Sequence, residues 1–132
     1  MQGVARAVLG IAGLLGATGV GLGAYGAHGL ARSLAGDSDI ELRIGWWQTA
    51  VQYHLLHAVA LVGVAWLTTK TEGRAAPLAA VCFAIGILLF SGTLYAMTLG
   101  APRFLGAVTP LGGLSLVVGW LALALSARTF TR

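Results

Sequence analysis

Four long stretches of this chain contain no Asp, Glu, Lys or Arg. They cover residues 7–31, 44–69, 75–102 and 104–127. Each is longer than the roughly 20 residues that an α-helix needs to cross about 30 Å of hydrocarbon. Transmembrane strands would show strict alternation, which is absent, and backbone groups in lipid must be hydrogen-bonded within the segment, which leaves helices. The sequence therefore predicts an all-α polytopic membrane protein with four transmembrane helices.

The composition supports a lipid environment. Only 9% of the 132 residues are charged and 58% are hydrophobic, whereas soluble domains carry about 25% charged residues. The net charge is +4, and the basic residues are scattered at the ends of the apolar stretches. This distribution suits lipid headgroups as partners and provides no basic stripe for nucleic acid. The chain has one cysteine, Cys82, so an intrachain disulfide is excluded.

We predict a single membrane domain over residues 1–132, with spans near 7–28, 46–68, 76–98 and 104–126. The connections are short, so the simplest topology is an up-down-up-down bundle. The longest, 29–45, is expected to be a solvated loop at the membrane surface, or a loop with one turn of surface helix. Two interpretations of the fourth span stay open: Thr109 and Pro110 form an N-cap and first helical residue after a bent connection, or Pro110 kinks a longer helix.

The basic residues of the short loops predict the orientation. Five lie on the side of the termini and three on the opposite side. The five are Arg6, Lys70, Arg74, Arg128 and Arg132; the three are Arg32, Arg43 and Arg103. Since cytoplasmic loops are enriched in Lys and Arg, both termini are predicted to be cytoplasmic.

Small residues recur at helical spacing in the first and fourth spans. Gly19 and Gly23 are one turn apart, and the last span contains Gly112 and Gly113. In lipid, small residues allow helices to approach closely. Two alternatives follow: the first helix packs within its own bundle, or its glycines join copies of a homo-oligomer. The GxGxxG pattern at 21–26 predicts no nucleotide site, because it lies inside an apolar run with no strand before it.

Polar side chains concentrate where the first and third spans end and the second and fourth begin. The candidates are Tyr25, His28, Gln52, Tyr53, His54, His57, Ser91, Tyr95 and Thr109. In an alternating bundle these segments share one side of the membrane. Because polar groups within spans tend to face the bundle interior or a cavity, we expect them to approach one another in the leaflet opposite the termini. Trp46 and Trp47 are expected at the headgroup boundary.

Several interpretations of this cluster remain. It forms an interhelical hydrogen-bond network, it holds the polar head of a quinone or lipid or passes protons, or its histidines bind a metal or haem. His28, His54 and His57 are the metal candidates, but no carboxylate or thiol in a span completes the site, and no histidine pair is aligned for haem. The acids all lie in loops, so no catalytic triad is present, and no particular cofactor is predicted.

Four ordered motifs resemble a known family. They are Gly26-Ala27-His28-Gly29-Leu30, the stretch 48–54 with His57-Ala58, the stretch 89–95, and the stretch 109–113 with Gly119-Trp120. In these motifs the chain is similar to the YgdD/YwdK family of small bacterial inner-membrane proteins, which carry a domain of unknown function. The resemblance covers nearly the whole chain. It implies four membrane helices and a plasma-membrane location, and it implies no activity.

The leading hypothesis is a non-enzymatic accessory or small-ligand or lipid-binding protein with a polar pocket in the non-cytoplasmic leaflet. The alternatives are a redox-associated protein that handles haem or metal through its histidines, and a purely structural homo-oligomer. The predicted partners are membrane lipids and further copies of the chain or a larger membrane complex, with no nucleic acid and no nucleotide.

Overall fold

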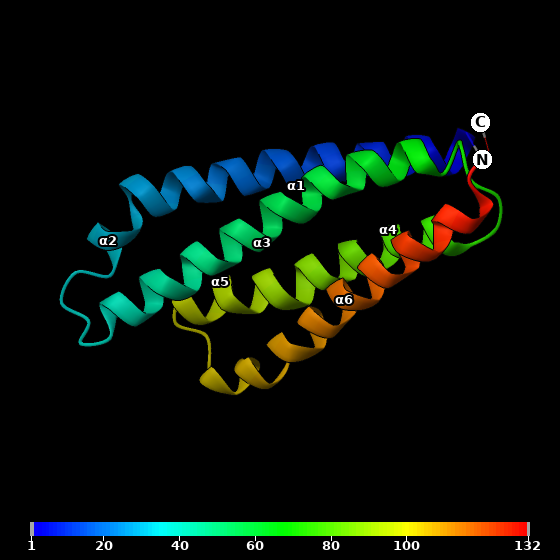
Figure 1. The fold of residues 1–132 in the computed structure, drawn as a ribbon. Coiled ribbons are helices and arrows are strands. Elements are labelled where there is room, and N and C mark those ends of the chain that lie inside the picture. The colour runs from blue at the N-terminus through cyan, green and yellow to red at the C-terminus, as the bar shows by residue number, and fades with distance from the viewer. Residues whose placement is uncertain (1, 132) are drawn as a thin grey trace.

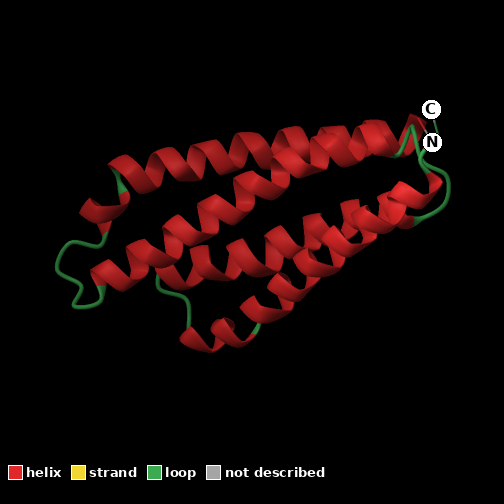
Figure 2. Ribbon diagram, viewed as in Figure 1, coloured by secondary structure: helices red, strands yellow, loops and turns green. Residues whose placement is uncertain are grey.

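The computed structural model describes residues 2–131 and contains four helical segments that are long and apolar enough to cross a membrane (Figures 1 and 2). The elements are α1 Gln2–His28, α2 Leu30–Ser33, α3 Ile40–Leu67, α4 Ala75–Gly86, the π-helical segment η1 Ile87–Ser91, α5 Gly92–Thr98, the 3₁₀ segment η2 Arg103–Ala107, α6 Thr109–Ser126 and η3 Ala127–Thr129. The third crossing is the continuous run α4–η1–α5. The predicted all-α architecture with four spans is confirmed.

Two helices extend further than the predicted spans. α1 begins at Gln2 and α3 at Ile40, ahead of the predicted starts near residues 7 and 46. The added turns contain Arg6, Glu41 and Arg43. A charged side chain marks the edge of the hydrocarbon, but it does not end a helix, because its backbone still hydrogen-bonds within the helix.

The fourth crossing starts with a break in the helix. Residues Arg103–Ala107 form a 3₁₀ turn, and α6 then begins at Thr109 with Pro110 in its first turn. A proline costs little there, since its missing N–H has no helical partner. The predicted N-cap is wrong: Val108 occupies that position without a side-chain cap, and the hydroxyl of Thr109 lies 2.7 Å from that of Thr93.

The helices form two antiparallel pairs. α1 packs along α3, α6 packs along α4, and the pairs join where α3 contacts the α4–η1–α5 run (Figure 1). Both termini lie at one end of the bundle, which we call the terminal end, with the connection 68–74. There Thr131 N donates to the Lys70 carbonyl at 2.8 Å, and Thr71 and Phe130 form an isolated antiparallel β-bridge. The opposite, distal end holds α2, the loop before α3, and η2.

Glycines in α1 allow this helix to pack closely against α3. A Cβ added at Gly19 would lie 2.7 Å from Leu55 Cδ2, and one at Gly23 would lie 3.3 Å from Val51 Cγ1. These glycines therefore face a helix of the same chain. This is the packing expected from the first of the two alternatives raised by the sequence.

A second glycine contact brings α6 onto η1. A Cβ on Gly112 would lie 2.3 Å from the backbone nitrogen of Phe90, so only glycine fits between the two backbones. The neighbouring Gly113 is less constrained, because its Cβ would lie 3.7 Å from the Phe90 ring. Gly112 thus fixes the position of α6 against the third crossing.

Candidate ligand-binding groove

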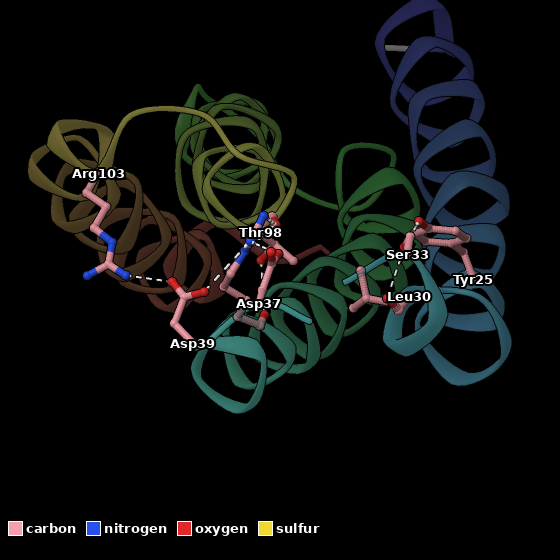
Figure 3. A network of polar contacts seen from close by, with 8 residues as sticks. Tyr25, Leu30, Ser33, Asp37, Asp39, Thr98 and Arg103 are labelled. Carbon is pink, nitrogen blue, oxygen red and sulfur yellow. Dashed lines mark hydrogen bonds and ion pairs between the residues drawn. The ribbon is translucent and has the colours of Figure 1, made fainter. Parts of the chain in front are cut away.

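The predicted polar side chains do not all meet in one cluster. Tyr25 lies toward the distal end, where its hydroxyl is 2.7 Å from the Ser33 hydroxyl on α2 (Figure 3). His28 is exposed at the end of α1. The remaining candidates separate into an inner group around Tyr95 and His54 and an outer group around Tyr53 and His57.

Trp47 links Tyr25 to the inner group. Its ring centroid is 5.4 Å from that of Tyr25 and 4.6 Å from that of Tyr95. The side chain of Trp47 points into the bundle and is only 2% exposed, while its expected depth at the headgroup boundary stays a prediction. Its indole N–H donates to the Leu22 carbonyl at 2.9 Å. The indole fits against Gly26, where an added Cβ would lie 2.6 Å from the ring.

His54 lies at the centre of the inner group. Its Nδ1 is 3.1 Å from the Tyr95 hydroxyl, and the ring is 4% exposed. Its Nε2 is buried without a hydrogen-bond partner among residues 2–131. The ring borders Gly19 of α1, whose added Cβ would lie 3.4 Å from His54 Cδ2. His54 therefore joins α3 to α5 through its Nδ1 and packs against α1 with the opposite edge.

Ser91 and Thr109 make structural hydrogen bonds. Ser91, at the end of η1, donates to the Ala50 carbonyl of α3 at 2.7 Å. The hydroxyls of Thr109 and Thr93 join α6 to α5 at 2.7 Å. Both side chains are occupied in holding helices together, which leaves them poorly suited to bind a further group.

His57 forms the outer group with Trp120, which was quoted above in a family motif but not named as a site candidate. Its Nδ1 lies 2.7 Å from the Tyr53 carbonyl, and Trp120 of α6 donates its indole N–H to His57 Nε2 at 3.1 Å. A carbonyl beside Nδ1 and a donor beside Nε2 together assign the neutral tautomer protonated on Nδ1. The signal for Trp120 was its place in mid-span, away from the aromatic belts, where an indole N–H needs an acceptor.

These side chains form the inner wall of a groove between α3 and α6 with a volume of about 490 Å³. Phe90 of η1 forms part of the groove, and its ring centroid is 4.5 Å from that of Tyr53. Gln52 and Tyr53 are exposed along the groove. Within residues 2–131, no hydrogen bond engages the Gln52 amide or the Tyr53 hydroxyl. The groove therefore presents two polar groups without a partner in the described chain, on a helix that is long and apolar enough to cross a membrane.

The distal end contains a polar network that sequence analysis missed (Figure 3). Arg43 donates to the Thr98 carbonyl through Nε at 2.8 Å and Nη2 at 2.5 Å, and it pairs with Asp37. Arg103 pairs with Asp39 at 2.6 Å. The prediction that residues 29–45 form a solvated loop is wrong for Arg43, because this residue lies in α3 and its side chain is only 14% exposed. The cause is the end of α5 at Thr98, where carbonyls without helical partners accept hydrogen bonds from the guanidinium.

The histidines do not converge on a metal. Within the part of the chain that the structure describes, no three His, Cys, Asp or Glu side chains lie close enough to hold an ion. His54 is directed toward Tyr95 and His57 toward Trp120, while His28 is exposed at the end of α1. This geometry gives no support to the metal or haem hypothesis.

Four apolar crossings, lipid-exposed outer faces and charges confined to the two ends define a polytopic integral membrane protein. Residues 22–113 match the family described as "Protein of unknown function (DUF423)", and the chain belongs to this family. No solved structure gives a significant match to the chain.

Three curated relatives agree with this assignment. The chain is 43% identical over 110 residues to the UPF0382 membrane protein YwdK of Bacillus subtilis, which covers 82% of this chain and 85% of the relative. It is 37% identical over 105 residues to a UPF0382 membrane protein of Haemophilus influenzae, covering 80% of each. It is 34% identical over 113 residues to the UPF0382 inner membrane protein YgdD of Escherichia coli K12, covering 86% and 82%. The predicted resemblance is confirmed, and none of these descriptions states an activity.

Proposed function

We propose that this protein is a non-enzymatic membrane component that binds a small lipid-soluble molecule in the groove between α3 and α6. One observation carries the proposal: the Gln52 amide and the Tyr53 hydroxyl line this groove without a hydrogen-bond partner among the described residues. Leaving a polar group unpaired in an apolar medium costs about 2–7 kcal/mol. A ligand with a polar head would supply the missing partner.

The groove restricts the chemistry of its ligand. An amide and a phenol can each donate to a carbonyl or hydroxyl oxygen, while Phe90 and Val117 offer apolar contact. The volume of about 490 Å³ lies within the range of about 300–1,000 Å³ found for small-molecule sites. The class that fits is a quinone or lipid, with at least one oxygen acceptor on an apolar body.

The groove lacks the groups of a hydrolytic or acid-base catalyst. The acids of the chain are Asp37, Asp39, Glu41 and Glu72, all near the ends of the bundle. The His57 ring is engaged on both nitrogens, by the Tyr53 carbonyl and by Trp120. A carboxylate to orient a base is therefore missing from the groove, which supports binding without catalysis.

The test compares molecules that remain with the protein after gentle extraction. Wild type, Gln52→Leu, Tyr53→Phe and the double variant are purified in mild detergent, and their organic extracts are surveyed by mass spectrometry. Gln48→Leu is the matched control, because Gln48 is also an exposed glutamine of α3 but lies outside this groove. We expect a molecule enriched with wild type and the control and depleted about tenfold in the double variant, from two hydrogen bonds of about 0.6–1 kcal/mol each. Equal extracts from all variants would overturn the proposal.

A homo-oligomer is the second candidate, and the position of Gln48 favours it. A groove of about 280 Å³ on the α1–α3 pair is lined by Gly23, Ala27, Gln48 and Gln52. A glutamine carries both donors and an acceptor, so the same face of a second copy is complementary to it. If copies associate here, Gln48→Leu should lower the particle mass measured in detergent. An unchanged mass would remove this candidate.

We also infer that both termini face the cytoplasm. The terminal end carries Arg6, Lys70, Arg74 and Arg128, whereas two of the three arginines at the distal end pair with aspartates. An excess of basic residues favours the cytoplasmic side. Fusion of green fluorescent protein to the C-terminus should then give fluorescent cells, and fusion of alkaline phosphatase should give inactive enzyme. The reverse pattern would refute this orientation. With the termini inside, we expect Gln52 and Tyr53 in the non-cytoplasmic leaflet, because they lie in the distal half of the charge-free stretch 44–69.

A further inference from the structure

A separate groove opens at the terminal end, between the start of α1 and the end of α3. Its volume is about 330 Å³. The lining includes Arg6 and Leu9 of α1, Val62 and Trp66 of α3, and Thr69 just beyond α3. The polar members lie toward the ends of the helices, and Leu9 and Val62 lie about one turn deeper. The groove therefore changes from polar at its mouth to apolar inside the membrane.

The donors at the mouth of this groove are not used by the protein. The ion pairs within residues 2–131 all lie at the distal end, so Arg6 has no acidic partner in the described chain. The indole N–H of Trp66 likewise has no acceptor there, unlike those of Trp47 and Trp120. Thr69 donates its hydroxyl proton to the Trp66 carbonyl at 2.7 Å. Arg6 and Trp66 are thus the free donors, one of them charged.

The terminal end as a whole is positively charged, like Arg6 at the mouth of the groove. In addition to Arg6, the terminal end carries Lys70, Arg74 and Arg128, and its acidic residue is Glu72. A site of this kind attracts an anion, and each basic residue near a membrane surface contributes about 1 kcal/mol to binding anionic lipid. An apolar groove below a cationic mouth matches a molecule with a negative head and a hydrocarbon tail.

We propose that this groove binds an anionic phospholipid. Its phosphate pairs with the Arg6 guanidinium, and a phosphate or ester oxygen accepts the Trp66 indole N–H. One acyl chain passes the small side chains of Ala5 and Ala65 at the mouth and lies along Leu9 and Val62 deeper in the groove. The site is independent of the α3–α6 groove, and it lies at the opposite end of α3 from Trp47.

The test is native mass spectrometry of the detergent-solubilised protein with equimolar phosphatidylglycerol and phosphatidylcholine of identical acyl chains. We expect phosphatidylglycerol to be retained preferentially. Arg6→Gln should reduce its retention about fivefold, which corresponds to the loss of about one surface charge. Arg32→Gln, an exposed arginine at the distal end, is the matched control and should have no effect.

A second variant separates the groove from the charge alone. Ala5→Phe places a ring in the mouth of the groove, where an acyl chain enters, and should reduce the retention of phosphatidylglycerol while Arg6 is intact. Glycerol phosphate at millimolar concentration should not displace the lipid, because it lacks the acyl chain. Equal retention of both lipids, equal effects of Arg6→Gln and Arg32→Gln, an inert Ala5→Phe, or displacement by glycerol phosphate would each overturn the proposal. Helical circular dichroism verifies that every variant is folded.

Discussion

The two ends of this bundle use the same residue type in opposite ways. At the distal end, Arg43 is engaged by Asp37 and the Thr98 carbonyl, and Arg103 is engaged by Asp39. At the terminal end, Arg6 lies at the mouth of a groove with no acidic partner in the described chain. An arginine beside acids and free carbonyls holds loops together, whereas one beside apolar surface alone is available to the membrane.

The interior differs along the same axis. The half of the bundle toward the termini is packed with apolar side chains, among them Leu61, Val64, Ala79, Phe83 and Ala122. The distal half contains Trp47, His54, Tyr95 and Thr98, each hydrogen-bonded across helices. In lipid, apolar side chains bring no drive for association, so the distal half gains its specificity from directed contacts. Four sets of substitutions, given in order of decreasing effect, test this difference.

Glycine contacts along α6 should give the largest contrast. Gly112→Ala is expected to cost about 3 kcal/mol of stability, because its Cβ would lie 2.3 Å from backbone that cannot move. Gly119→Ala, nearer the terminal end, should cost less, because its Cβ would lie 2.6 Å from the Phe83 side chain and not from backbone. Gly113→Ala is the control and should be nearly neutral. Unfolding in detergent measures all three, and equal losses at Gly112 and Gly119 would remove the contrast.

Loss of Arg43 should have the next largest effect. Arg43→Met is expected to cost about 2 kcal/mol, because the Thr98 carbonyl loses a charged donor. Arg74→Met at the terminal end should change stability by less than about 0.5 kcal/mol, as expected for an exposed side chain without such contacts. Thermal unfolding in detergent measures the loss of stability in each of the two variants. Similar losses would mean that the ends do not differ as described.

The Trp120–His57 hydrogen bond is a directed contact within the mainly apolar half, beside Phe83, and its loss should have a moderate effect. Trp120→Phe keeps an aromatic ring but removes the donor to His57 Nε2, with an expected cost of about 1 kcal/mol. Trp66→Phe is the terminal-end comparison and should leave stability unchanged, because its indole N–H has no acceptor in the described chain. A loss at Trp66 as large as at Trp120 would contradict the assignment of the free donor.

The exposed ion pair should have the smallest effect. Arg103→Gln removes the partner of Asp39, but the Arg103 side chain is 67% exposed, so the expected cost is about 0.5 kcal/mol or less. Salt screens such pairs, and the difference from wild type should vanish at about 1 M NaCl. A loss that persists at high salt would show that Arg103 acts through its contact with Trp46, 5.6 Å from the ring centroid, and not through charge.

The number and approximate positions of the crossings were predictable from the sequence, because a charge in hydrocarbon is costly and its absence marks a span. Helix ends outside the membrane were not, since Arg6 and Glu41 are compatible with helix. The inward position of Trp47 and the use of Arg43 were also missed. Trp47 and Arg43 each donate to a backbone carbonyl of another helix, that of Leu22 or Thr98. Hydrophobic periodicity along the sequence does not reveal such contacts between helices. The groove polar groups Gln52 and Tyr53 were named in advance, while their grouping with Trp120 required the fold.

The widened turn Ile87–Ser91 has a consequence for everything that follows it in the third crossing. A π-type turn accommodates one additional residue, and each residue of an α-helix advances the side chains by about 100° around the axis. Converting this turn to regular α-helix with all its residues kept would rotate the following side chains by about 100°, and would swing Tyr95 away from His54 and Thr98 away from Arg43. The π-helical turn Ile87–Ser91 therefore determines the direction in which the side chains of α5 point.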